Sequence, residues 1–425
     1  MQIYSYPDKS LWPELTRRPV VDQDDLYKSV RKILAKTKAK GDKALKKFTW
    51  EFDGIQLKKL VVSEKEISEA LALVPEELKL AIQQARQNIG IFHKAQQEAS
   101  EKVETMPGIL CWRQDSAIEK VGFYIPGGSA PLFSTILMLA VPASLAGCKE
   151  IILCTPPGTD GKIHPAILYT AQLCGIHKLF KVGGAQAVAA MAYGTETIPK
   201  VYKIFGPGNQ YVTLAKQLIQ EEGIAIDMPA GPSELLVIAD GTAEPAFVAA
   251  DLLSQAEHGP DSQVILVTTD STMAYEVKNA LAHQLDQLPR KKIASLALEK
   301  SKLVIVKDLN EALAFSNHYA PEHLILACSG AEDLGGRVIN AGSVFIGNYS
   351  PESAGDYASG TNHTLPTNGY AAMYSGVSLD SFVKKISFQQ LSKEGLERIG
   401  PTVMNMAAAE GLEAHRNAVA IRIKK

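Results

Sequence analysis

The stretch Val121-Gly-Phe-Tyr-Ile-Pro-Gly-Gly-Ser-Ala130 decides the fold class, because it joins an apolar strand to a turn of proline and glycine. From Val121 onward, short apolar segments typical of strands alternate with helical segments, and Gly and Pro separate them. This alternation predicts parallel α/β sheets with helices on their faces. The expected strands form two series, which cover 121–125, 150–154, 179–182 and 201–205, and then 235–239, 263–268, 303–306, 324–327 and 344–346.

The boundary between the two series lies in the turn-rich segment Met228-Pro-Ala-Gly-Pro-Ser-Glu234. Such a segment predicts a crossover between two packed α/β domains, and ligands of such folds bind at the carboxyl ends of the strands. Before the strands, apolar residues at three- and four-residue spacing predict helices from Asp24 to about Lys102. After them, the last ~45 residues are expected to form a helical tail that is too short for a core of its own.

The composition is that of an ordinary globular protein. The 425 residues are 46% apolar and 21% charged, which is enough for two or three domains with cores of their own. A formal net charge of -2 leaves no positive excess for binding a phosphate backbone. We therefore expect a small substrate and no nucleic-acid partner.

Targeting signals and cysteine motifs are not evident in the sequence. Residues Met1–Ser10 contain no basic stretch followed by an apolar run. The apolar run 134–147 is interrupted by Pro142 and is shorter than the ~20 residues of a membrane helix. We expect a cytoplasmic protein with no membrane contact. Its five cysteines lack CxxC spacing, so neither disulfides nor a thiolate zinc site are expected.

The segment Pro245–Gly259 predicts an amphipathic helix that ends at a glycine. Gln255 and His258 are three residues apart in this segment, so their side chains share one face of its last turn. The two side chains could bind one metal ion. Alternatively, His258 only complements the negative charge at the end of the helix.

A second polar cluster occupies Gly355–His363, a glycine-punctuated segment that is expected to form a loop carrying Asp356 and His363. The alternative is a turn in which Asp356 only bonds the backbone. Glu410 and His415 follow near the C-terminus, where by themselves they indicate an ordinary exposed helix. The Gln, the Asp and two of the His residues together offer the nitrogen and oxygen donors that Zn²⁺ accepts. A Gln ligand is unusual for zinc, so Mn²⁺ remains open.

Glu322 and His323 are adjacent in Ala320-Pro-Glu-His-Leu324, between an expected helix that ends near Tyr319 and an expected strand. Neighbours in sequence point in different directions, so the carboxylate and the imidazole could serve two separate proton transfers. One of the two could instead be a buried structural group.

Three glycine-rich turns each follow an expected strand and open an expected helix: Pro126–Ala130, Val182–Gln186 and Phe205–Asn209. Free backbone N–H groups and the helix dipole at such turns favour the phosphates of a nucleotide. The G-x-G-x-x-G pattern is not completed, because Tyr211 occupies the third place after Gly206 and Gly208. Simple tight turns are the alternative interpretation.

Taken in order, these motifs resemble those of the histidinol dehydrogenase family. The resemblance runs from about Val121 to the C-terminus, and several long motifs in the right order are far more specific than one short motif. The matching segments are Tyr124–Leu132, Val182–Ala187, Phe205–Asn209, Asp227–Glu234, Ser254–Gln263, Ala320–Leu324, Gly355–His363 and Glu413–His415.

The resemblance implies an enzyme that oxidises histidinol through histidinaldehyde to histidine with two NAD, the last step of histidine biosynthesis. It implies one zinc ion per subunit, and it implies Glu322 and His323 as the acid/base pair. The zinc ligands and the acid/base pair are also implied contacts of the substrate. The implied zinc ligands are Gln255, His258, Asp356 and His415. The implied further substrate contacts are Ser233, His363 and Glu410, and the implied NAD contacts are Tyr124, Gln186 and Asn209.

The resemblance also implies two packed, incomplete Rossmann-like domains with small helical extensions at both ends. We expect residues 21–123 and 234–377 to form the first α/β domain, with the metal and catalytic residues, and 124–233 to form the NAD-binding domain. Residues 1–20 would be an N-terminal arm and 378–425 a helical tail. Family members are homodimers, and their tails cross over, so Glu410 and His415 would complete the site of the neighbouring subunit.

Three rival functions remain open from the sequence. A zinc hydrolase would employ Glu322 to activate water, and a metal-dependent sugar- or nucleotide-binding module would turn over nothing. A cysteine-based aldehyde dehydrogenase would use Cys148 or Cys154 as its nucleophile, although both border an apolar strand, where a packing role is usual.

Overall fold

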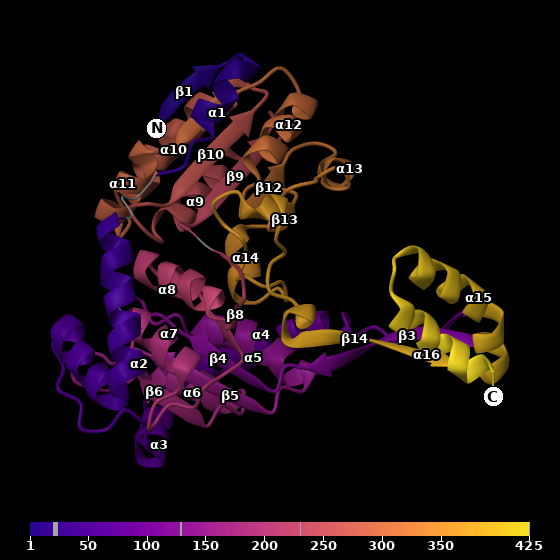
Figure 1. Ribbon diagram of the computed structural model, residues 1–425. Helices are drawn as coiled ribbons and strands as arrows, with labels where there is room; N and C mark the ends of the chain where they lie inside the picture. Colours follow the sequence, from indigo (N-terminus) through magenta and orange to yellow (C-terminus); the bar gives the residue numbers. More distant parts are fainter. Residues whose placement is uncertain (20–23, 128–129, 230, 425) are drawn as a thin grey trace.

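The two series of apolar segments form two separate parallel sheets in the computed structural model, which describes residues 1–19, 24–127, 130–229 and 231–424. The first sheet has the strand order β6-β5-β4-β7-β8, and the second has the order β1-β11-β10-β9-β12-β13 (Figure 1). The α/β fold class with two parallel sheets is therefore confirmed. The strands of the first sheet are β4 (Lys120–Tyr124), β5 (Glu150–Thr155), β6 (Lys178–Lys181), β7 (Lys203–Phe205) and β8 (Ala225–Ile226). Those of the second are β1 (Gln2–Ser5), β9 (Glu234–Ala239), β10 (Gln263–Thr268), β11 (Lys302–Ile305), β12 (His323–Ala327) and β13 (Ser343–Ile346).

Helices cover both faces of each sheet, which explains why the strands are continuous apolar runs. Every residue of β9, β10 and β12 is buried. The helices that follow strands of the first sheet are α5 (Phe133–Ala146), α6 (Pro165–Leu173), α7 (Gly184–Tyr193) and α8 (Gln210–Glu221). Those of the second sheet are α9 (Pro245–Ala256), α10 (Ser271–Leu285), α11 (Lys291–Glu299), α12 (Leu309–Tyr319) and α13 (Ala331–Gly335).

The N-terminal segment is part of the six-stranded sheet. Strand β1 pairs in parallel with β11 at the sheet edge, and η1 (Lys9–Leu11) and α1 (Trp12–Leu15) follow it. Trp12 packs edge-on against Phe315 of α12 with 5.4 Å between ring centroids. Burial of Trp12 and Leu15 in this core attaches the segment firmly to the second sheet.

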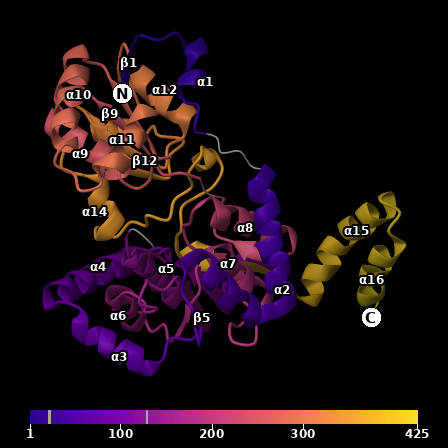
Figure 2. The same ribbon diagram turned by 90° about the vertical axis from the view of Figure 1, so that its left-hand side faces the viewer.

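The long N-terminal helices pack on the five-stranded sheet. They are α2 (Asp24–Asp53), which is kinked at Gly41, α3 (Glu64–Leu73) and α4 (Glu76–Lys94). Helix α2 contacts α7 and α8, α3 contacts α6, and α4 contacts α5 (Figure 2). From the sequence, residues 21–123 are expected to share a domain with 234–377. The apolar faces of α2, α3 and α4 are instead buried against 124–233.

The end of the chain contains a strand that the sequence analysis did not predict. Strand β14 (Val383–Leu391) pairs antiparallel with β3 (Ile109–Ala117), which also pairs with β2 (Val103–Met106). The expectation of an all-helical tail from residue 378 is therefore wrong for 383–391. Helices α15 (Lys393–Ala409) and α16 (Glu413–Ile423) pack on each other and project from the body (Figure 1). The short helices α14 (Glu352–Tyr357), η2 (Tyr370–Ala372) and η3 (Leu379–Phe382) complete the fold.

The crossover between the sheets decides which edges meet. The chain leaves the carboxyl end of β8 at Ile226 and enters the amino end of β9 at Glu234. Because all strands within each sheet are parallel, the carboxyl edge of the five-stranded sheet lies toward the amino edge of the six-stranded sheet. Helix α14 lies between the two (Figure 1). Within the described residues, no helix combines the length and the apolar character needed to cross a lipid bilayer.

The turn after β7 depends on Gly206, whose φ is +126°. A Cβ atom on Gly206 would lie well inside van der Waals contact of the carbonyl oxygen of Tyr124. Gly223 also has a positive φ, of +87°, but a Cβ there would meet nothing within 4 Å. Comparing an alanine substitution at the two positions therefore separates the effect of backbone strain from the effect of steric overlap.

We expect Gly206→Ala to lower the free energy of unfolding by about 2 kcal/mol more than Gly223→Ala, because only the first substitution adds overpacking to positive-φ strain. Urea unfolding of both variants, with slopes compared against the parent protein, measures the difference. Equal losses in the two variants would show that the turn relaxes around the added methyl group.

Candidate active site

Glu322 and His323 lie at the amino end of β12, where a left-handed residue, Ala320, ends α12. The Glu322 carboxylate accepts a hydrogen bond from the backbone N–H of Glu234, with 2.8 Å between Oε2 and N. Nδ1 of His323 donates to the Glu234 carbonyl oxygen at 3.1 Å. Since a carbonyl only accepts, Nδ1 carries the hydrogen and Nε2 is left to face the polar cluster.

Asp356 faces His323 from α14, with 3.4 Å between its Oδ1 atom and Nε2 of His323. The sequence analysis placed Asp356 in a loop, but it lies in the last turn of a short helix. Helix α14 packs against α9, which brings Asp356 toward the face that carries Gln255 and His258. The Asx-turn alternative does not describe this side chain, because its carboxylate points to the imidazole.

Gln255 and His258 adjoin each other at the end of α9, with 3.4 Å between the amide Nε2 and the imidazole Nδ1. Gln255 is fully buried, and its Oε1 atom has no hydrogen-bond partner among the described residues. Burial lowers the pKa of His258. The charge of Asp356 raises this pKa, and His323 and His363 lower it further. A neutral imidazole and an unsatisfied buried amide oxygen are both suited to a cation.

His363 connects the cluster to the five-stranded domain. Its Nδ1 atom donates to the carbonyl oxygen of Asp356 at 2.7 Å. Its Nε2 atom lies 3.1 Å from Oγ1 of Thr135 in α5. His363 therefore spans the space between the two sheets, and burial lowers the pKa of its imidazole.

Glu352 is a member of the cluster that the sequence analysis missed. Ligand atoms of His323, Glu352 and Asp356 all lie within 4.8 Å of one another. The Oε2 atom of Glu352 is buried without a hydrogen-bond partner among the described residues, and burial raises the pKa of this carboxyl well above its usual range. Its spacing of four residues from Asp356, on one helix face, is the signal that could have indicated it.

Negative charge dominates this buried cluster. Burial lowers the pKa of His323, but the charges of Glu352, Glu322 and Asp356 outweigh burial and hold it well above its usual value. Burial raises the pKa of Glu322 to about 8. Burial acts on Asp356 in the same direction, yet the hydrogen bond and charge of His323 prevail and keep the pKa of Asp356 below its usual value. Three carboxylates, neutral imidazoles and an orphaned amide oxygen fit a divalent cation.

Two predicted site residues lie apart from the cluster in this chain. Glu410 directly follows α15, and His415 lies in α16, and both side chains are exposed. The helical pair that carries them projects from the body (Figure 1). The chain thus brings together three of the four predicted zinc ligands, and the fourth, His415, lies apart from them.

The predicted NAD contacts lie at the carboxyl edge of the five-stranded sheet. The Tyr124 hydroxyl accepts a hydrogen bond from the N–H of Gly184 at 3.2 Å, and Gln186 is buried in the first turn of α7. Asn209 caps α8 by accepting from the N–H groups of Tyr211 and Val212. The turn at 126–130 includes residues 128 and 129, which lie outside the described residues, whereas the other two turns open helices as expected.

The predicted acid/base pair lies at the amino edge of the six-stranded sheet, not at a carboxyl edge. Glu322, His323 and Ser233 lie at the amino ends of β12 and β9. In the six-stranded sheet the predicted site residues therefore lie at the amino edge, whereas the general expectation for such folds is a ligand at the carboxyl ends of the strands. The reason is the crossover at 227–233, which turns the amino edge of that sheet toward the nucleotide-type turns.

Comparison with known proteins assigns the family. The model of the histidinol dehydrogenase family matches residues 16–423. This chain belongs to the histidinol dehydrogenase family. It is 58% identical over 423 residues to the histidinol dehydrogenase of Bacteroides thetaiotaomicron, with 100% of this chain and 99% of the relative covered. It is 52% identical over 413 residues to that of Escherichia coli, with 96% and 94% covered.

A solved structure agrees over the full length. The crystal structure of histidinol dehydrogenase from Elizabethkingia anophelis has a TM-score of 0.98 and 58% sequence identity to this chain. The match covers 100% of this chain and 98% of the chain in that crystal structure. The histidinol dehydrogenase family consists of NAD-dependent oxidoreductases, so the chain is an enzyme of that class. The assignment gives no support to the hydrolase alternative or to a module without turnover.

The cysteine-based alternative also conflicts with the structure. Cys154 is fully buried in the core of the five-stranded domain, and burial raises the pKa of its thiol. Burial also raises the pKa of Cys148 to about 11. Only the thiolate is an effective nucleophile, so both thiols are in the unreactive form at neutral pH.

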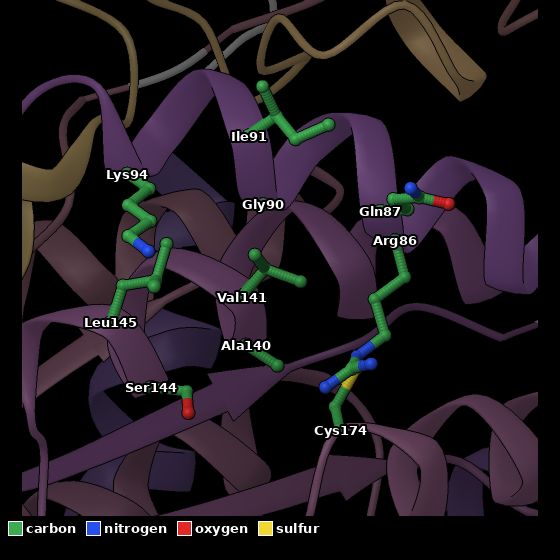
Figure 3. A pocket seen from close by; sticks show the side chains of 10 residues that line it. All are labelled: Arg86, Gln87, Gly90, Ile91, Lys94, Ala140, Val141, Ser144, Leu145 and Cys174. Atoms are coloured by element: carbon green, nitrogen blue, oxygen red, sulfur yellow. The ribbon is translucent and has the colours of Figure 1, made fainter.

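A cavity of about 320 Å³ lies between α4 and α5, away from the polar cluster (Figure 3). Arg86 and Lys94 of α4 border it, and Val141 and Leu145 of α5 form part of its apolar wall. Its lining includes none of the acid/base or ligand-type residues described above.

We expect Gln255→Ala to weaken Zn²⁺ binding at least about 10-fold, because it removes a buried amide oxygen that a cation would satisfy. Titration of metal-free protein with Zn²⁺ in the presence of a competing chelator measures the affinity. Gln84→Ala is the control, since Gln84 is an exposed residue of α4 whose side chain donates a hydrogen bond to Asn88. An unchanged affinity of Gln255→Ala would remove Gln255 from the ligand set.

Proposed function

We propose that this chain oxidises L-histidinol to L-histidine through histidinaldehyde with two NAD, as the last step of histidine biosynthesis. The observation that carries the proposal is the position of Glu322 and His323, which lie beside metal-type donors at an edge that faces nucleotide-type turns. The membership of the chain in the histidinol dehydrogenase family supports the same reaction.

We assign the metal site to Gln255, His258 and Asp356, with His415 supplied by a second copy of the chain, and the metal to one Zn²⁺ per chain. When bound, the ion would supply a Lewis acid for the nitrogen lone pairs of the substrate and a positive charge beside the carboxylates. The same charge balances the carboxylates around His323. Ser233, His363 and Glu410 are the proposed further substrate contacts.

His323 is the proposed base for the alcohol step. Its Nδ1–H is held by the Glu234 carbonyl at 3.1 Å. The surrounding carboxylates raise the pKa of His323, so Nε2 would be free to accept the hydroxyl proton of the substrate once a bound cation offsets their charge. NAD accepts the hydride, and Tyr124, Gln186 and Asn209 are the proposed contacts to it. The alcohol carbon must then lie between the amino edge of the six-stranded sheet and the carboxyl edge of the other.

Glu322 is the proposed base for the aldehyde step. An aldehyde must add water before it can lose a second hydride, and a carboxylate next to the site can remove a proton from that water. Burial raises the pKa of Glu322 to about 8. The carboxylate form therefore increases as the pH rises through that value, and the aldehyde step increases with it.

We expect about two NADH to form per histidinol consumed, because alcohol to carboxylate is a four-electron oxidation and each hydride carries two electrons. Removal of metal with a chelator should abolish NADH formation, and Zn²⁺ should restore it. Absorbance of NADH and chromatography of histidinol and histidine measure the stoichiometry. One NADH per histidinol, with aldehyde accumulating, would contradict the second oxidation.

We propose further that the enzyme is a homodimer with shared sites. Exposed apolar side chains on the projecting helical pair, including Met406, Leu412 and Ile421, support a surface for a second copy. In a symmetric dimer each pair would reach the body of the partner and add Glu410 and His415 to its site.

We expect His415→Ala and Gln255→Ala to be inactive as separate preparations and to regain activity when they are mixed and re-associated. Each hybrid dimer would contain one intact site, so about one quarter of the parental activity should return. The control is the mixture of Gln255→Ala with His258→Ala, whose defects lie in the same body. If the first mixture stays as inactive as the control, the sites are not shared.

A further inference from the structure

The N-terminal segment reaches the candidate active site through a partly buried side chain, Arg18. Its guanidinium binds the Glu234 carboxylate with two hydrogen bonds, Nε to Oε1 at 2.5 Å and Nη2 to Oε2 at 2.9 Å. The exposed fractions of the two side chains are 16% and 2%. A guanidinium stays protonated and binds a carboxylate in a fixed planar geometry, so this contact sets both the place and the orientation of Glu234.

Further contacts hold the pair in place. Nη2 of Arg18 also donates to the carbonyl oxygen of Tyr319 at 2.6 Å, and the guanidinium lies over the Tyr319 ring at 4.1 Å. The Glu234 carboxylate accepts a third hydrogen bond from the N–H of Asn368 at 2.7 Å. Two segments far apart in the sequence, at Arg18 and Asn368, therefore bind one carboxylate, and Tyr319 holds the guanidinium.

The backbone of Glu234 contacts both members of the acid/base pair. Its N–H donates to the Glu322 carboxylate at 2.8 Å, and its carbonyl oxygen accepts from Nδ1 of His323 at 3.1 Å. Glu234 is the first residue of β9, and pairing of β9 with β12 begins one residue later, at Leu235 opposite His323. On the other side of β9, Glu234 pairs with Gln263 of β10. The ladder therefore holds the Glu234 peptide only on the β10 side. On the β12 side its N–H and carbonyl oxygen bond the side chains of Glu322 and His323, and the contacts of the Glu234 carboxylate add to the hold on this residue.

We propose that Arg18 is a positioning residue: through Glu234 it holds the two backbone groups that orient Glu322 and His323 for proton transfer. The proposal rests on the catalytic roles assigned to those two residues above. Arg18 touches neither of them. It acts by holding the peptide that fixes the direction of the carboxylate and the hydrogen-bearing nitrogen of the imidazole.

A purely structural role is the competing explanation, and the same segment provides controls for it. Leu15 is buried in the core of the six-stranded domain, so Leu15→Ala weakens the attachment of the segment and leaves the ion pair in place. Arg17 is the exposed neighbour of Arg18, and Arg17→Met removes one positive charge at the adjacent position. Arg18→Lys retains the charge but not the two-pronged geometry.

For Arg18→Met we expect kcat for histidinol oxidation to fall about 10- to 100-fold, because small displacements of reacting groups have effects of this size. KM for NAD and the zinc content should change by less than about a factor of 3. Arg18→Lys should recover part of the loss, and Arg17→Met should resemble the parent enzyme. Steady-state kinetics of the zinc-loaded enzymes, with metal analysis and thermal unfolding of each, provide these values.

The outcomes separate the explanations. If Leu15→Ala, at an equal or larger loss of thermal stability, lowers kcat as much as Arg18→Met, or if Arg18→Met leaves kcat unchanged, the positioning role is refuted. Glu322→Gln and His323→Asn test the underlying function independently. Full activity in both would overturn the proposed function, whereas their inactivity beside a fully active Arg18→Met would overturn this inference alone.

Discussion

The opposition of two sheet edges is the constraint on which the rest of this structure depends. The chain passes from β8 to β9 through residues 227–233, and this short connection turns the amino edge of one parallel sheet toward the carboxyl edge of the other. The carboxyl edge offers turns with free N–H groups. The amino edge offers Glu322 and His323, and α14 adds Asp356 from between the sheets. The proposed NAD contacts lie on one edge and the proposed acid/base groups on the other, so the proposed redox site needs both edges.

Electrostatics explains why the catalytic groups need a buried setting. Glu322, Glu352 and Asp356 surround His323, and burial makes their repulsion and their attraction to the imidazole strong. A group of carboxylates of this density is stable only with a compensating cation or with bound protons. The neutral His258 and the unsatisfied oxygen of Gln255, both at the end of α9, are groups that can bind such a cation. The cluster thus combines acid/base groups with the conditions for binding a metal.

Most strands of the two parallel sheets, all but β1 and the two-residue β8, could be predicted because their signal is local. Residues 235–239 and 263–268 are buried on both faces, so their continuous apolar runs stand out in the sequence. Strand β14 has a mostly exposed burial pattern, and its extended form depends on pairing with β3, more than 250 residues earlier. Strand β1 likewise depends on β11. Asp356 is expected in a loop from the sequence because its helix has only six residues, Glu352–Tyr357, and contains Gly355, so the apolar period of a helix does not stand out.

The sequence by itself determined the chemistry that is available: the order of strands, the adjacent Glu322 and His323, the Gln255 and His258 spacing on one helix face, and the family. Those features are written in neighbouring residues, where backbone geometry alone relates the side chains. Only the tertiary structure decided that Glu352 joins the cluster, that Arg18 binds Glu234 across 216 positions, and that His415 lies away from the site of its own chain. These relations depend on how the sheets and helices pack, and packing brings together residues between which the sequence records no spacing.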